Sequence, residues 1–543
     1  IAHFKAVAAE RNLADPAKKK IEIACGQRLP DKASLRKNVG YAVPKRIYAA
    51  LGIHTFLQNK QKHLDIKYNL NNIFSLLVFN RFLFPSSKKK AYDSRDFFFD
   101  SFRFSMADLY RALDYFAQYS ETLQKHLHQN VAEIIGRSNE LGYYDVTNYY
   151  FEIPYNDEDQ YDVNGKVSKK GFRKKGPSKE HQPKPIVQMG LLMDSNGIPM
   201  AFNTFSGAQS EKTSMLPVIR RVKRDYDLKR VVVVADRGLN TSDNTAFLSG
   251  RNDDDARGHD GYVYGQSVLG ADKEFKAWVL NPEGYIHDTE KGKDGTDVKF
   301  THKSRIFAKT IQLENRKGVR KLKMTMYQKQ MAYYSEKYAQ KQKKDRELAL
   351  AKARDLIANP GKYTKATTYG AAGYVKNLKF FKDTGEIATG IDLSLDLARI
   401  EYEEKFDGFY SIVTSEKDLP DKEIRDIYKG LWEIEESFKI IKSEFKARPV
   451  YVRLEDHINA HFLICFVALL ILRVLDYKLG HQYSVGQIRE SLKNYSCTHI
   501  DENYYVFDYR DDILQAMEHI FGFDFGNKIL AKAEIKNILK YPK

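Results

Sequence analysis

The spacing of hydrophobic residues predicts helices early in the chain and strands from residue 142 onward. Between about 41 and 135, apolar side chains recur at intervals of three and four residues, which is typical of helices buried on one face. At Gly142 the pattern changes to aromatic and β-branched runs, beginning with GYYDVTNYYFE (142–152). Strands that are followed by alternating helices and strands indicate a mixed α/β sheet.

Further strands and one helix are predicted downstream of this first strand. Ser195-Asn196-Gly197 separates two apolar runs and favours a hairpin turn. Four consecutive valines within VVVVAD are typical of a strand buried on both faces. The predicted elements are strands at 184–194, 198–205, 231–236 and 261–268, and a helix at about 242–249.

After residue 272 the organisation changes again. A basic stretch at about 320–357 is interpreted as one long helix, in which Tyr327, Met331, Tyr334 and Tyr338 form a packing face. From 316 to 354 it holds 13 Lys and Arg against 3 Asp and Glu, which fits a solvated helix or a DNA contact. Strands are predicted at 391–396 and 408–415, and helices at about 421–446, 454–478, 484–494, 511–520 and 528–540.

Composition and charge narrow the class of protein. The 543 residues are 43% hydrophobic and carry a net charge of +17, which favours a polyanionic partner, nucleic acid before an acidic membrane surface. The mean hydropathy is −0.54, which argues against an integral membrane protein. The longest apolar run, Phe462 to Leu472, is about half of a membrane span and is interpreted as a buried helix.

The cysteines and the first residues bear on the compartment. Cys25, Cys465 and Cys497 are far apart and form no CxxC pair, which argues against a zinc finger and a disulfide framework. We therefore expect a reducing, cytoplasmic setting. The chain begins Ile1-Ala2-His3 without a signal-peptide pattern, and the missing initiator Met suggests that the natural start lies upstream.

Two aspartates in the predicted sheet are candidates for catalysis. Asp145 lies within an aromatic strand, where an ionised carboxylate is costly to bury unless it is paired. Asp236 ends the four-valine strand, and the carboxyl ends of such strands are where open α/β sheets bind ligands. The alternative is that each Asp forms a turn or caps a helix, which is the more common role for a single Asp at a strand end.

The predicted helix at 421–446 supplies a third acid. Its apolar stripe runs from Ile427 to Phe445, and Glu435 lies at the border of that stripe with Tyr428 and Lys442 two turns to either side. The alternative is a partly buried, salt-bridged Glu. Three carboxylates that converge from two strands and a helix would form a site for two Mg²⁺ or Mn²⁺ ions, about 3.5–4 Å apart, that promote in-line attack on a phosphate.

At these residues the chain resembles DDE transposases of insertion sequences, in the IS4 group and most closely its IS1634 branch. The resemblance rests on YYDVTNYYFE at Asp145, VVVVADRGL at Asp236 and YKGLWEIEESFKIIKSEFKARPVY at Glu435. NRFLFPSSKKKAYD (80–93) also resembles the branch's amino-terminal region. The group's signature of Tyr, Arg, Glu and Lys is matched by Tyr428, Glu435 and Lys442, whereas the Arg position holds Leu431.

The resemblance implies an α/β fold with an RNase H-like mixed-sheet catalytic core, a β-rich and helical insertion before Glu435, a helical DNA-binding region and a helical C-terminal region. It also implies double-stranded DNA as partner, a homodimer that pairs two terminal inverted repeats, and a bacterial or archaeal, nucleoid-associated protein without a membrane role. The predicted segments are a loosely ordered basic arm (1–40), the DNA-binding helices (41–135), the core (136–271 and 401–478), the insertion (272–400) and the C-terminal region (479–543).

Candidate DNA contacts follow from the same residues. Besides the metal-binding acids Asp145, Asp236 and Glu435, basic and aromatic side chains near them are expected to bind phosphates. These candidates are Tyr428, Lys439, Lys442, Arg448 and Arg237, together with Lys88, Lys89 and Lys90, which are predicted to lie in a loop between helices. Two alternatives stay open: a nuclease on the same core that never joins ends, and a domesticated DNA-binding protein without catalysis.

Overall fold

The computed structural model describes residues 26, 28, 31, 35–138, 140–176, 184–228, 230–249, 260–291, 297–313, 322–365, 367–368, 370–381, 386–388, 392–501 and 503–541. They form two compact units. One unit contains the described residues up to Tyr115 and those from Ile471, and the other spans Phe116–Leu470. The division at residue 115 separates the helix α7 (Ser120–Ile135) from the other N-terminal helices and places it with the unit that holds the candidate acids.

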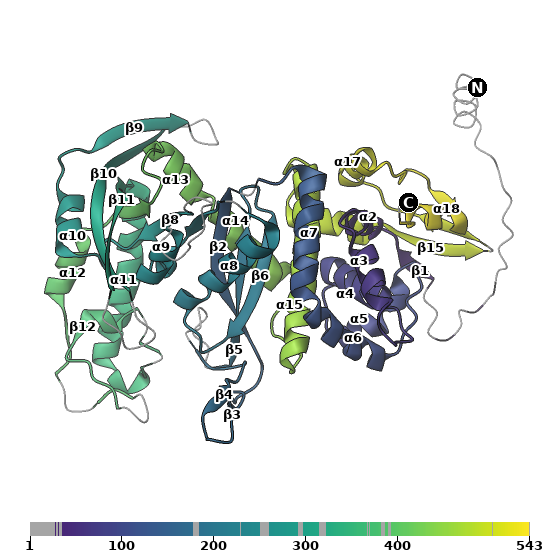
Figure 1. Ribbon diagram of the computed structural model, residues 1–543, viewed down its shortest axis with the longest axis horizontal. Helices are drawn as coiled ribbons and strands as arrows, with labels where there is room; N and C mark the ends of the chain where they lie inside the picture. The colour runs from purple at the N-terminus through teal and green to yellow at the C-terminus, as the bar shows by residue number, and fades with distance from the viewer. Residues whose placement is uncertain are drawn as a thin grey trace. The chain divides into compact units, whose positions relative to one another are not determined.

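The larger unit is built on a mixed sheet, which has nine strands among the described residues (Figure 1). The pairs β2–β7 and β7–β8 are parallel, and the other neighbours are antiparallel. In spatial order the strands are β6 (Pro199–Ser206), β5 (Ile186–Met193), β2 (Leu141–Tyr150), β7 (Val232–Ala235), β8 (Gly261–Gln266), β14 (Phe409–Thr414), β11 (Leu322–Tyr334), β10 (Asp297–Leu313) and β9 (Ile286–Lys291).

Several predicted elements of this sheet are confirmed. The first strand, the four-valine strand and the hairpin at Ser195-Asn196-Gly197 all form, and Gly197 has the positive φ of 69° that its turn position requires. One face packs on the helices α8 (Met215–Tyr226) and α9 (Ser242–Leu248) through a buried apolar cluster. The helix α8 was missing from the sequence prediction, although its apolar positions recur at helical spacing.

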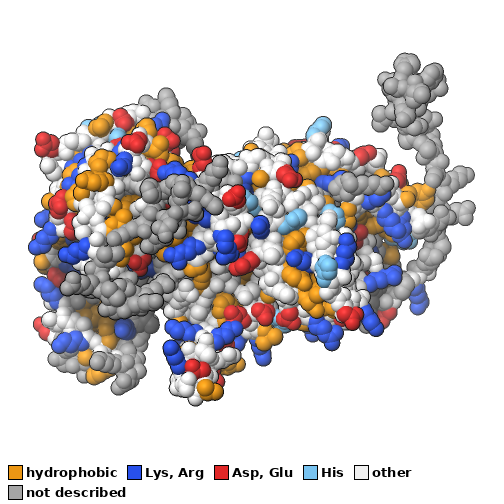
Figure 2. Space-filling view, in the orientation of Figure 1, with side chains coloured by type: hydrophobic (Ala, Val, Ile, Leu, Met, Phe, Trp, Pro, Cys, Tyr) orange, Lys and Arg blue, Asp and Glu red, His pale blue; other side chains and the backbone are white. Residues whose placement is uncertain are grey.

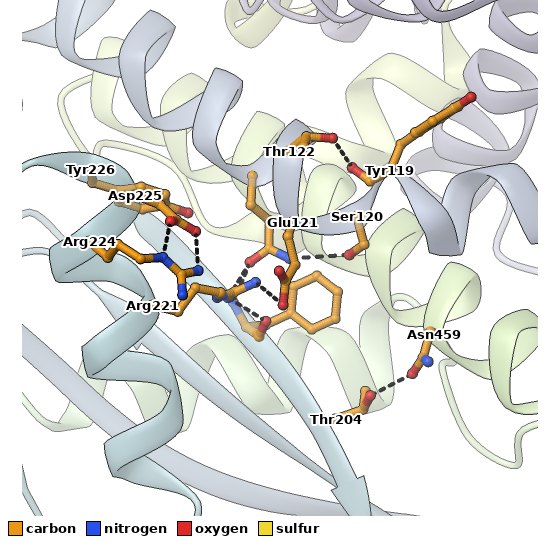
Figure 3. A network of polar contacts seen from close by, with 12 residues as sticks. Tyr119, Ser120, Glu121, Thr122, Thr204, Arg221, Arg224, Asp225, Tyr226 and Asn459 are labelled. Carbon is orange, nitrogen blue, oxygen red and sulfur yellow. Dashed lines mark hydrogen bonds and ion pairs between the residues drawn. The ribbon is translucent and has the colours of Figure 1, made fainter.

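A polar network fixes α7 to this unit (Figure 3). Arg221 of α8 donates to Gln124 Oε1 and to the Phe202 carbonyl, both at 3.0 Å, and the Phe202 N–H donates to the same Gln124 oxygen at 2.9 Å. Phe202 lies on β6, and on the same strand the Thr204 hydroxyl donates to Asn459 of the helix α15 (Glu455–Lys478) at 2.5 Å. Because Arg221 and Gln124 are both buried, these bonds satisfy groups that would otherwise be costly to desolvate.

The interval between Asp236 and Glu435 adds strands to the sheet and helices beside it. The prediction of one helix over 320–357 is wrong in its first part, because Leu322–Tyr334 forms β11 and pairs with β10 along 13 residues. Tyr327 is 64% exposed while Met331 is fully buried, so the predicted packing face does not exist. The interval also contains α10 (Lys273–Leu280), α11 (Glu336–Ala358), α12 (Leu397–Glu404), the short strands β12 (Val375–Lys376) and β13 (Ser394–Leu395), and two 3-10 turns at Pro360–Lys362 and Ala372–Tyr374.

The other unit joins the two ends of the described chain. Its strand β1 pairs with β15 in a sheet of order β1-β15-β16-β17 within the described residues. The expected loose arm therefore does not extend to residue 40, because Arg36–Asn38 is a strand and Val39 is fully buried. The remaining elements are α2 (Ala42–Ala50), α3 (Ile53–Gln61), α4 (Leu70–Leu83), α5 (Lys88–Asp93), α6 (Met106–Gln118), α16 (Val485–Asn494), α17 (Asp512–Phe521), α18 (Lys532–Ile538), β15 (Ser496–Asp501), β16 (Tyr504–Phe507) and β17 (Ile529–Ala531).

The three C-terminal strands correct the expectation of a purely helical end. Ser496–Asp501 pairs on one side with β1 and on the other with β16, so its hydrogen bonds depend on a segment about 460 residues earlier in the chain. The predicted helices at 484–494 and 511–520 are confirmed as α16 and α17. The helix predicted at 528–540 is shorter, because Ile529–Ala531 forms the edge strand β17 first.

The long apolar helix α15 is a core element. By length and composition it could cross a membrane, but 94% of its most apolar window is buried inside the protein. The interpretation of Phe462–Leu472 as a buried helix is therefore confirmed. Cys465 on this helix and Cys497 on β15 are both buried free thiols, whereas Cys25 lies outside the described residues.

Candidate active site

Asp145 lies on β2, and Asp236 follows the end of the adjacent parallel strand β7. The register pairs Leu141 with Val232 and Tyr143 with Val234, so Asp145 lies two residues beyond the last paired position on β2. Because side chains alternate along a strand, both acids lie on the face of the sheet opposite the α8–α9 cluster. Asp145 is half-buried, whereas Asp236 is exposed.

Asp236 also caps the turn that follows it. Its Oδ1 accepts a hydrogen bond of 2.6 Å from the Arg237 N–H, at the start of the 3-10 turn Arg237–Leu239. The alternative role that the sequence left open, a capping Asp, is therefore realised. This bond also fixes the direction of the carboxylate, which is what a residue that binds a ligand at a strand end requires.

Tyr428 approaches Asp236 over Gly265. The register of β7 and β8 places Gly265 beside Asp236, and a Cβ at residue 265 would collide with the Tyr428 hydroxyl. The Asp236 carboxylate is close enough to this hydroxyl for its negative charge to act on the pKa of Tyr428. Burial raises the pKa of Tyr428 well above its usual range, and the negative charge of Asp236 raises it further, so the phenol stays protonated and can donate.

Glu435 lies on a helical arm that is bent where a continuous helix was expected. The predicted helix at 421–446 divides into α13 (Asp421–Lys429), α14 (Trp432–Lys439) and a π-helical turn, Ile440–Glu444. Tyr143 of β2 packs against this break: its hydroxyl donates to the Ile427 carbonyl at 3.0 Å, and its ring lies where a side chain on Gly430 would project. The burial of Tyr143, with the charge of Glu433, raises its pKa to about 12.

The bend presents Glu435 to two adjacent clefts. A cleft of about 470 Å³ is lined by Asp236, Tyr428 and Glu435, and one of about 370 Å³ is lined by Asp145 and Glu435. Glu435 is exposed, which differs from its predicted place at a buried border. In the part of the chain that the structure describes, no three His, Cys, Asp or Glu side chains are grouped closely enough to hold one ion. The carboxylates thus form two pairs that share Glu435.

Basic residues line both clefts beside the paired carboxylates. Lys439, Lys442 and Arg448 line the Asp145 cleft, and the Lys442 ammonium lies 5.6 Å from the centre of the Tyr149 ring. Arg237 lines the Asp236 cleft and is exposed. The structure therefore brings the candidate residues of the larger unit to one region. On the face shown in Figure 2, basic and acidic side chains are interspersed, so the charge surplus is not gathered into one patch there.

The three lysines of the N-terminal region belong to the other unit. Lys88 begins α5, where Ser87 caps the helix by accepting from the Lys90 N–H. The expected basic loop is therefore a helix. Lys89 and Lys90 are exposed, but Lys88 is buried, which leaves two of the three available to a ligand.

Sequence reasoning missed two contributors to the Asp236 cleft. The sequence prediction gave Gly265 no role, whereas in the structure the Tyr428 hydroxyl occupies the space that a side chain there would need. Tyr338, Lys341 and Gln342 of α11 also line this cleft, although they lie about 100 residues from either acid along the chain. The basic run that contains Lys341 was visible in the sequence, but nothing local placed it at the site.

Part of the chain matches one known protein family. Residues 293–471 match a family model described as Transposase DDE domain, which spans the second half of the sheet, Glu435 and most of α15. The match supports assignment to a DDE transposase family, and the large mixed sheet with its many helices is consistent with such a domain. No curated protein matches the chain.

Proposed function

We propose that this protein is a DNA transposase of the DDE type, in the IS4 group and its IS1634 branch. It cleaves at the terminal inverted repeats of an insertion sequence and joins the 3′-OH ends to target DNA. The observation that carries this proposal is that Glu435 lines one cleft with Asp236 and a second with Asp145, where the parallel strands β7 and β2 supply the two aspartates. The family match over 293–471 supports it.

The topology around the two aspartates supports an RNase H-like core. The five strands run β6-β5-β2-β7-β8, with an antiparallel meander on one side of β2 and two parallel strands on the other. The first acid lies on the central strand and the second at the end of the adjacent parallel strand. The interval from β9 to α12 is then the insertion between the second acid and Glu435.

The donor set fits divalent metal ions. Carboxylate oxygens are the ligands that Mg²⁺ and Mn²⁺ prefer, and each cleft offers two carboxylates, one of them from Glu435. We infer that Asp145, Asp236 and Glu435 hold two such ions. Bound there, the ions would lower the pKa of water or of a 3′-hydroxyl and neutralise charge on the attacked phosphate.

The surrounding residues would bind and orient the DNA strand. Lys442 and Arg448 lie in the Asp145 cleft, where they can neutralise phosphates next to the attacked one, and Lys439 and Arg237 are exposed at the two clefts. Tyr428 borders the cleft beside Asp236, and its protonated hydroxyl can donate to a phosphate oxygen or to the carboxylate. Lys89 and Lys90 of the other unit are further candidates for phosphate contacts. A homodimer that pairs two element ends in the cytoplasm completes the proposal.

The test is a cleavage and strand-transfer assay on linear DNA that carries the element's own ends, with Mg²⁺ or Mn²⁺. Wild type should cut and join, whereas Glu435→Gln should bind the ends without cutting. Glu423→Gln is the matched control, because Glu423 is exposed on α13 and lines neither cleft. Cleavage without joining would favour the nuclease alternative. Binding without cleavage by wild type would overturn the proposal in favour of a non-catalytic DNA-binding protein.

A further inference from the structure

We propose that Lys341, in the long interval between the second and third acids, binds a backbone phosphate of the DNA strand that enters the Asp236–Glu435 cleft. The α11 helix would thereby form part of the substrate-binding wall of the active site. This inference rests on the proposed function and assigns a role to a segment that carries none of the three acids.

The cleft itself is the first observation. Its volume is about 470 Å³, and its lining combines Asp236, Tyr428 and Glu435 with Tyr338, Lys341 and Gln342 of α11. A phosphodiester that reaches these two acids therefore enters a space that α11 also borders. Among the residues that line the cleft, Lys341 and Arg237 are the two cations.

The second observation is that α11 is held firmly at this position. Arg346 forms a two-pronged ion pair with Asp407, at 2.7 and 2.6 Å, and its side chain is buried. One turn earlier, Gln342 Oε1 accepts from the Gly408 N–H at 2.7 Å. Asp407 and Gly408 immediately precede β14, which pairs with β8 beside the acids. These three hydrogen bonds thus fix the turn of α11 that carries Lys341 relative to the sheet.

The third observation concerns charge. Lys341 is exposed, and within the described ranges it has no hydrogen bond or ion pair. The proposed metal ions would offset Asp236 and Glu435 at the attacked phosphate, but the neighbouring phosphates of the strand need other cations along the cleft. A lysine that is positioned by its helix and not committed to a protein carboxylate can supply this offset, as a point charge on a flexible stem.

The same helix offers a matched control. Lys344 is also exposed, carries the same charge and has no partner in the described part of the chain, but it does not line the cleft. Replacing either lysine by Ala changes the net charge equally. A difference between Lys341→Ala and Lys344→Ala therefore reports on position and not on the overall field of the protein.

The experiment compares full-length wild type, Lys341→Ala, Lys341→Arg and Lys344→Ala on linear DNA with the element's ends. We expect Lys341→Ala to reduce the rate of a single round of cleavage by about 10-fold, the effect of one charge-assisted contact. The rate is measured at protein concentrations that do not saturate the DNA. The slope of log Kd against log salt should become shallower by about 0.9, the value for one lost phosphate contact. Lys341→Arg should restore both quantities, and Lys344→Ala should match wild type.

Two results would overturn the inference. One is that Lys341→Ala and Lys344→Ala have the same cleavage rate and the same salt slope. If wild type still cleaves in that case, the inference about Lys341 fails and the proposed function stands. The other is that Lys341→Arg is as impaired as Lys341→Ala, which would indicate a packing role. If wild type binds the ends and never cleaves, the proposed function fails, and the salt slope of DNA binding still decides whether Lys341 contacts a phosphate.

Discussion

The hydroxyl of Tyr428 occupies the space that a side chain on Gly265 would need. The two residues are 163 positions apart in the sequence and meet because α13 packs against β8. The contact allows the phenol to reach Asp236, which lies next to Gly265 in the register. The absence of a side chain at residue 265 therefore leaves room for the Tyr428 hydroxyl near the candidate acid Asp236.

Gly265→Ala should displace Tyr428 and reduce cleavage by at least ~10-fold, with a loss of stability of about 1–3 kcal/mol from overpacking. Single-turnover cleavage and thermal unfolding measure the two effects. Gly238→Ala is the control, because Gly238 lies two residues after Asp236 and a Cβ there meets no atom within 4 Å. Adding Tyr428→Phe to Gly265→Ala should recover stability but not activity. If the double variant is as unstable as Gly265→Ala, the collision is not the cause.

Tyr428 should not titrate in the working pH range. Burial and then the charge of Asp236 raise its pKa, so the phenol stays protonated at pH values where an ordinary Tyr, with a pKa of about 10, would ionise. We expect Tyr428→Phe to lower the cleavage rate by a similar factor at every pH from about 7 to 10. Rates measured over this range for both proteins check the expectation. If the ratio of the wild-type cleavage rate to the Tyr428→Phe rate falls to one near pH 10, the hydroxyl ionises in this range.

Asp421, which begins the helical arm of Tyr428, should contribute stability that depends on pH. It accepts from Lys329 at 2.7 Å and lies 3.1 Å from His302 Nδ1. Burial alone would raise its pKa, but the hydrogen bonds from Lys329 and Ser304 outweigh burial and lower it. A carboxyl with a lowered folded pKa stabilises the protein above its unfolded value of about 3.9, and this contribution is lost as pH falls through the folded pKa.

Asp421→Asn should therefore be less stable than wild type at neutral pH, and the difference should shrink as the solution becomes more acidic than about pH 4. Denaturant unfolding at a series of pH values measures the free-energy difference. Asp418→Asn serves as the comparison, since Asp418 is exposed and lies just before the helix. A difference that is constant down to the acid limit would show that Asp421 acts through shape and not through charge.

Local pattern was sufficient for much of the fold and for the choice of acids. The aromatic first strand, the valine strand, the Asn-Gly hairpin and the apolar α15 are confirmed, because each is specified by side-chain periodicity or by a turn residue within a short window. Asp145, Asp236 and Glu435 were selected from the sequence, and the structure places all three at adjoining clefts. Their roles remain a proposal that the cleavage assay decides.

Tertiary structure decided what depends on distant partners. The segment 322–334 has apolar residues at helical spacing, yet it is a strand because β10 supplies its hydrogen bonds along 13 residues. The strand at 496–501 pairs with β1, and the break before Glu435 is packed against the Tyr143 hydroxyl where Gly430 leaves space. Lys341 and Asp236 line one cleft, and the Arg346–Asp407 pair joins the helix of Lys341 to the segment before β14. Such pairings cost chain entropy and are repaid only in the folded state, so no short window of sequence contains them.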